Sequence, residues 1–89
     1  MTERDVKLAA RAAKVRPLHV IYNEIRTDWS KVYFGAVPYL EAMASLDGIE
    51  DKYFLDDARS IVIYFLSNAT TWRGETARRI KAELKGLLK

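Results

Sequence analysis

The chain contains no cysteine, and this absence removes whole classes of site. Neither a disulfide framework nor a thiolate metal centre can form. Its hydrophobic runs are short as well: the longest extends from Ile61 to Leu66, whereas a membrane-spanning helix needs about 20 apolar residues. The N-terminal stretch carries acids and lacks the uninterrupted apolar segment of a secretory signal. These absences predict a cytoplasmic protein without a membrane span.

Residues that interrupt regular structure are also scarce, since 89 residues include two prolines and four glycines. Apolar residues make up 49% of the chain, which is typical of a globular protein rather than a disordered one. The length is enough for one domain, so we expect a single helical domain over 1–89. Apolar positions recur mostly at helical spacings of three and four. The expected helices cover residues 3–14, 17–27, 38–46, 57–68 and 71–88.

The predicted fold is therefore all-α: a compact single-domain bundle of four to five helices. The helix over 57–68 is apolar on nearly all sides, which predicts a central position. Residues 1–16 are expected to form a basic N-terminal helix that docks loosely through small residues or frays. Pro17 either breaks or kinks this N-terminal helix, because proline disfavours helix at the residue before it.

The connections carry their own expectations. Residues 29–37 predict an ordered loop whose aromatic side chains fill the core, and 49–55 predict an acidic and aromatic connection. Asp56 is a good N-cap for the helix that follows. Thr70 or Thr71 is expected to cap the last helix, with Trp72 and Arg73 in its first turn. Gly74 within that turn indicates close approach of another backbone or of a ligand.

Catalytic and metal-binding patterns are missing from the sequence. His19 is the only histidine, and no nucleophile motif accompanies it. A calcium loop counted from Asp47 fails, because its third position is Ile49 and its twelfth is Ala58. No glycine-rich phosphate loop occurs. We therefore expect a protein that is not an enzyme and holds neither a cofactor nor a metal.

Charge is unevenly distributed although the net value is only +3. Residues 1–16 carry +3, residues 17–72 carry −4 and residues 73–89 carry +4, by counting Lys and Arg against Asp and Glu. Basic helical stripes can neutralise nucleic-acid phosphates. The modest net charge, and a last helix longer than a usual recognition helix, argue against that use. The candidate contacts to nucleic acid or to an acidic partner are Arg73, Arg78, Arg79, Lys81 and Lys85.

Ten aromatic residues exceed what one small core must hold, and several lie in or beside predicted loops. Aromatic and arginine side chains are favoured anchors of protein interfaces. The candidate interface residues are Trp29, Tyr33, Phe34, Tyr39, Tyr53 and Phe54. The sequence thus predicts a small cytoplasmic interaction or regulatory protein that binds a protein partner or forms a homodimer. The alternative is a nucleic-acid-binding accessory protein that uses the basic C-terminal helix, and its short length suits accessory proteins of phages and mobile elements.

Overall fold

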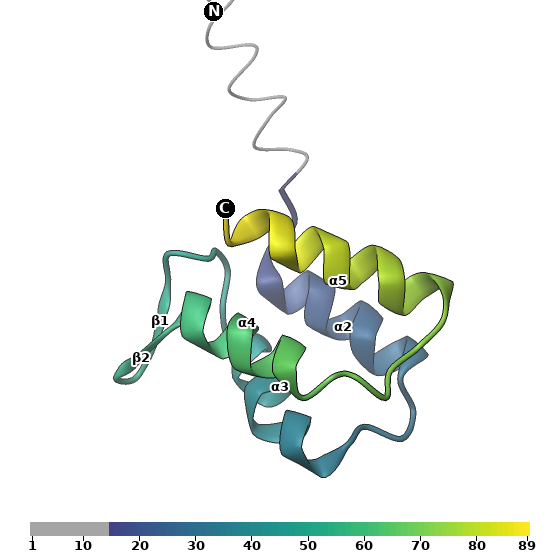
Figure 1. Ribbon diagram of the computed structural model, residues 1–89. Coiled ribbons are helices and arrows are strands. Elements are labelled where there is room, and N and C mark those ends of the chain that lie inside the picture. The colour runs from purple at the N-terminus through teal and green to yellow at the C-terminus, as the bar shows by residue number, and fades with distance from the viewer. Residues whose placement is uncertain (1–14) are drawn as a thin grey trace, which may run out of the picture.

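Helices dominate residues 15–89, the part of the chain that the computed structural model describes (Figure 1). The elements are α2 (Leu18–Asp28), the 3-10 helix η1 (Phe34–Ala36), α3 (Val37–Met43), β1 (Lys52–Tyr53), β2 (Asp56–Asp57), α4 (Ala58–Ser67) and α5 (Glu75–Leu87). The helix expected over 3–14 lies outside the described residues. Within them, α5 packs against α2, and α3 packs against both α2 and α4.

Pro17 precedes α2 and does not belong to it. Its backbone is extended, with φ −59° and ψ 147°, and the helix begins at Leu18. Proline suits this position because it lacks an amide hydrogen, which the first turn of a helix does not use. Leu18, Ile21 and Ile25 are buried on one face of α2, as their spacing predicts. The helix over 17–27 is therefore confirmed to within one residue at each end.

Three aromatic rings meet in the core and join segments far apart in the sequence. Trp29 follows α2, and its ring stacks on Trp72 with centroids 5.6 Å apart and planes 8° apart. Phe65 of α4 packs edge-on against both, at 6.2 and 6.4 Å. Offset stacking and edge contacts are the favoured arrangements of aromatic rings. This cluster fixes the connection between α4 and α5 against the end of α2.

The all-α prediction is wrong at residues 52–57, where the chain forms a small β-hairpin. β1 and β2 pair antiparallel, with Lys52 opposite Asp57 and Tyr53 opposite Asp56. Phe54 and Leu55 form the two-residue turn between them. Short hairpin turns usually carry glycine or asparagine where φ is positive, but here Phe54 adopts φ 57°. The sequence of the turn therefore gives no hairpin signal.

The central helix and its cap also need correction. α4 begins at Ala58, and its N-cap is Asp57 rather than Asp56: the Ser60 amide donates to Asp57 Oδ1 at 2.7 Å. The predicted burial of Ile61 and Phe65 is confirmed. Ile63 and Tyr64, however, are about half exposed, so neighbouring elements do not enclose α4 on all sides. An apolar helix in this protein therefore covers the core with one face and meets solvent with the other.

The last helix begins later than expected. α5 starts at Glu75, so Trp72 and Arg73 precede it, and neither Thr70 nor Thr71 is its N-cap. The N-cap is Gly74, with φ 117° and ψ −179°, a conformation that is essentially reserved for glycine. The predicted close approach of another backbone at Gly74 is wrong, because no atom of residues 15–89 beyond its chain neighbours lies within 4 Å of the position that a Cβ would take. The approach of a ligand stays a prediction. Backbone conformation, rather than space, requires this glycine.

The loop 29–37 is partly as expected. Trp29 does fill the core, but Tyr33 and Phe34 point away from it and are exposed. α3 starts at Val37 and ends at Met43, three residues before the predicted end, and a turn carries the chain on to the buried Leu46. Pro38 lies in the first turn of α3, the position that proline favours.

Candidate functional site

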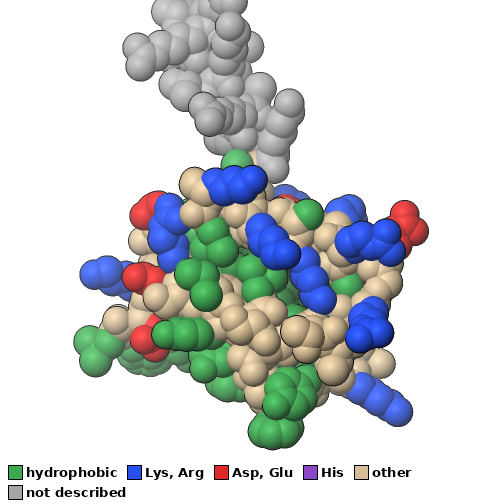
Figure 2. All heavy atoms as spheres, in the orientation of Figure 1, with side chains coloured by type: hydrophobic (Ala, Val, Ile, Leu, Met, Phe, Trp, Pro, Cys, Tyr) green, Lys and Arg blue, Asp and Glu red, His purple; other side chains and the backbone are tan. Residues whose placement is uncertain are grey.

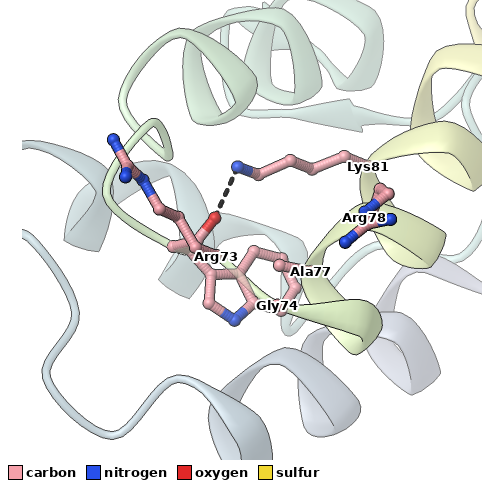
Figure 3. Close-up of a pocket in the computed structure, with 6 residues that line it drawn as sticks. Arg73, Gly74, Ala77, Arg78 and Lys81 are labelled. Atoms are coloured by element: carbon pink, nitrogen blue, oxygen red, sulfur yellow. Dashed lines mark hydrogen bonds between the residues drawn. The ribbon is translucent and has the colours of Figure 1, made fainter.

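Two surfaces of the described residues have the chemistry to bind another molecule. The first surrounds a shallow pocket of about 300 Å³ at the start of α5. It is lined by Trp72, Arg73, Gly74, Ala77, Arg78 and Lys81 (Figure 3). Arg73 extends from the loop on one side of the pocket, and Arg78 and Lys81 extend from α5 on the other. Two of the lining residues, Trp72 and Ala77, are buried.

Trp72 fixes the position of this pocket. Its Nε1–H donates to Asp28 Oδ2 at 2.8 Å, and its ring stacks on Trp29. Its carbonyl oxygen accepts from Lys81 Nζ at 2.6 Å, the bond drawn in Figure 3. The loop before α5 is thus held from both sides, by α2 through the indole and by α5 through the carbonyl.

Lys81 is less exposed than its place in a charged stripe predicts. Its side chain lies over Trp72, with Nζ 5.9 Å from the ring centroid, a cation–π distance. Partial burial lowers the pKa of its ammonium group, and the positive charges of Lys85 and Arg73 lower it further. Those two cations therefore lie close enough to Lys81 to repel its charge.

Arg79, also a predicted contact, belongs to a different environment. It pairs with Glu24 of α2, which Arg16 also approaches at 2.8 Å. Arg16 in turn forms two bonds to Glu83, of 3.0 and 2.6 Å, and the network ties α2 to α5. The hydrogen bonds from Arg79 and Arg16 hold the pKa of Glu24 below its ordinary value.

Arg73, which precedes α5, and three cations of α5 form no such ion pair with the described residues. Among the ion pairs within residues 15–89, none involves Arg73, Arg78, Lys81 or Lys85. We call these four side chains the cationic surface. Figure 2 shows blue side chains gathered over α5 in the upper part of the molecule.

The second surface is apolar and follows α4. Phe34 is 80% exposed, Phe54 is 84% exposed and Leu55 is fully exposed, while Tyr33, Ile63 and Tyr64 are about half exposed. We call these six residues the apolar surface. Green side chains project at the lower left of Figure 2, where the hairpin lies, and at its lower edge. The hairpin leads directly into the N-terminal end of α4.

The opposite end of the apolar surface lies beside the C-terminal end of α4. A Cβ placed on Gly35 would come within 2.5 Å of the Tyr33 ring and 2.9 Å of Asn68 Oδ1, so Tyr33 lies next to Asn68. Ile63 and Tyr64 occupy the stretch between the two ends. The ten residues of α4 span about 15 Å at 1.5 Å per residue. The apolar surface is thus roughly as long as this helix.

Half of the predicted interface residues lie on the apolar surface. Tyr33, Phe34 and Phe54 are exposed as expected. Trp29 is not an interface residue, because it is buried in the core, and Tyr39 and Tyr53 are half-buried against that core. Residue type alone did not distinguish the exposed aromatic residues from the buried and half-buried ones.

Three members of the apolar surface were missed by the sequence prediction. Helical spacing places Ile63 and Tyr64 on the side of α4 away from its main buried face, but the apolar sequence gives no signal that this side meets solvent. Leu55 carries no such signal either, because its exposure depends on the hairpin turn.

The acidic residues near the hairpin have structural roles. Asp51 Oδ2 accepts from the amides of Asp47 and Gly48 at 2.9 and 3.0 Å, and Asp57 caps α4. Within residues 15–89, no three histidine, aspartate or glutamate side chains gather as a metal-binding group. None of the helices in that range is long and apolar enough to cross a bilayer. The distance between His19 Nε2 and Asp47 Oδ1 is 3.0 Å.

Comparison with protein-family models, with curated proteins and with solved structures gives no significant match.

Proposed function

We propose that this chain is a non-enzymatic interaction protein whose apolar surface binds a second copy of itself. The observation that carries the proposal is the nearly complete exposure of Phe34, Phe54 and Leu55. Single exposed apolar residues are common, but a group of large ones with nearly complete exposure is typical of an interaction site.

The conformation of Phe54 supports an interaction role for the hairpin. A bulky residue with positive φ is strained, and this cost is of order 1–3 kcal/mol. The ring packs on Tyr53 at 4.8 Å but is otherwise presented to solvent. Folding alone gains little from a phenylalanine at this position. A binding role explains why the chain carries one there.

A second copy fits the chemistry and the size of this surface. Its six members carry no charge, so two copies of the surface can meet across a two-fold axis without burying an unpaired charge. Aromatic side chains bury about 150–250 Å² each, so the group offers on the order of 600–800 Å², close to the roughly 800 Å² per partner of a standard interface.

Sedimentation velocity tests this proposal with the protein itself as the probe. We expect dimers to dissociate on dilution between about 300 and 1 μM, a range that brackets micromolar dissociation constants. The double variant Phe54→Asn/Leu55→Ser should remain monomeric with an unchanged circular dichroism spectrum. Val20→Ser is the matched control, because Val20 is a partly exposed apolar residue of α2 outside the apolar surface.

Two outcomes contradict the proposal. One is a wild-type protein that stays monomeric throughout the concentration range. The other is a dimer that the double variant forms as readily as the wild type, which would assign the contact to a different surface.

A further inference from the structure

The cationic surface differs from the apolar surface in position and in chemistry. Arg78, Lys81 and Lys85 follow one another at spacings of three and four along α5, and Arg73 extends the group at its N-terminal end. From residue 78 to residue 85 the helix rises by about 10 Å, at 1.5 Å per residue. Positive charge is therefore arranged as a short row, with the pocket at one end.

We infer that this row binds the phosphate backbone of a nucleic acid, with Arg73, Arg78, Lys81 and Lys85 each contacting one phosphate along the strand. One strand of duplex DNA carries a phosphate every 3.4 Å or so along its axis, and the row spans about three such steps. The inference does not depend on the apolar surface or on dimer formation.

The composition of the row favours a nucleic acid over a protein partner. The core of a protein interface is depleted in charge and rich in exposed apolar groups. Here the apolar lining residues Trp72 and Ala77 are buried beneath the cations and offer almost no surface. An anionic membrane is disfavoured for the same reason, because an interfacial helix inserts an apolar face that α5 instead uses for the core.

Each cation has donors to spare for a phosphate. Lys81 donates one of its three hydrogens to the Trp72 carbonyl and retains two. Arg78 is exposed and presents a planar fork of N–H groups, which matches two phosphate oxygens. The buried Trp72 cannot stack on a base, so recognition should be independent of nucleotide sequence.

The test is the salt dependence of binding to a fluorescent 20-base-pair DNA duplex, followed by anisotropy. Four phosphate contacts predict a slope of log K against log salt near −3.6, so affinity should fall roughly 150-fold between about 50 and 200 mM salt. Arg78→Gln should reduce the slope by about 0.9 for each chain that contacts the duplex. Arg78→Lys, which keeps the charge, should leave the slope within about 0.3 of wild type. Lys52→Gln on the hairpin removes one positive charge elsewhere and should leave the slope unchanged.

Three results would overturn the inference. Absence of binding at low salt is the first. The second is a slope that falls equally in Arg78→Gln and Lys52→Gln, which would indicate only the net charge of the protein. The third is poly-glutamate of matched charge binding more tightly than the duplex, which would assign the row to an acidic protein. All of these results are independent of the sedimentation experiment, because the variants leave the apolar surface intact.

Discussion

Replacing Gly74 by alanine should destabilise the protein even though the new methyl group would contact nothing. The backbone at Gly74 has φ 117° and ψ −179°, a region that residues with a Cβ avoid at a cost of about 1–3 kcal/mol. No atom lies within 4 Å of the added Cβ, so steric overlap contributes nothing. Alanine also restricts the unfolded chain, which offsets about 0.4–1 kcal/mol. The two ranges leave a net loss of about 0–2.6 kcal/mol, or about 1.3 kcal/mol at their midpoints.

Urea unfolding followed by tryptophan fluorescence measures this loss, because Trp29 and Trp72 are stacked in the core. Gly86→Ala is the matched control: Gly86 lies inside α5, and a Cβ there also meets nothing. The free energy of unfolding of that variant should rise by up to about 1 kcal/mol, because alanine is favoured over glycine in a helix by about this amount. If Gly74→Ala proved as stable as the wild type, the break before α5 would not depend on the glycine conformation.

Three further changes test the contacts that hold the fold. Asp28→Ala should cost about 1–3 kcal/mol of unfolding free energy, because the buried indole N–H of Trp72 loses its acceptor. Glu24→Gln should reduce the loss of stability on acidification. Arg79 helps to lower the pKa of Glu24 in the folded state, so the ionised carboxylate stabilises the fold above about pH 4.5. This stabilisation disappears as the pH falls through the lowered pKa. Phe54→Asn should raise stability by up to about 1 kcal/mol in thermal unfolding, because asparagine tolerates positive φ better than phenylalanine.

For each of these three predictions, a specific result would contradict it. Asp56→Ala serves as the control for Asp28, since Asp56 is an exposed acid whose removal should change stability by less than about 0.5 kcal/mol. Equal effects of the two substitutions would mean that the Trp72 bond contributes nothing. If Glu24→Gln and wild-type proteins lost stability in parallel between about pH 5 and pH 3, the arginine pairs of Glu24 would not contribute to the pH dependence of stability. At a protein concentration low enough for the wild type to be monomeric, a Phe54→Asn variant less stable than wild type would show that the ring supports the fold.

Helical periodicity predicted the buried faces of α2, α4 and α5, because amphipathic spacing depends directly on which side chains leave water. The buried positions Ile21, Phe65 and Ile80 follow from it. Exposure of the other face of α4 could not be predicted, because a run of apolar residues is the same whether a helix is enclosed or covers one side of a core. The apolar surface is the result of that ambiguity.

The hairpin and the start of α5 could not be predicted from the sequence, because each depends on one residue with positive φ. Phe54 adopts that conformation without being glycine or asparagine, so its turn carries no sequence signal. Glycine is unfavourable inside a helix, but Thr70 and Thr71 offer a conventional N-cap just before Gly74, so the sequence predicts a helix that begins too early. Tertiary contacts of Trp72 decided the outcome. The sequence also could not distinguish Arg79, which pairs with Glu24, from Arg78, which lines the pocket. This difference depends on how α2 packs against α5.

The most direct test of the apolar surface as a self-association site is a dilution series of ¹⁵N-labelled protein followed by NMR. We predict that amide signals of residues 33–34, 54–55 and 63–64 shift together with protein concentration, while those of residues 73–85 remain in place. Concentration-dependent shifts confined to α5, or no shifts at any concentration, would rule out self-association through the apolar surface.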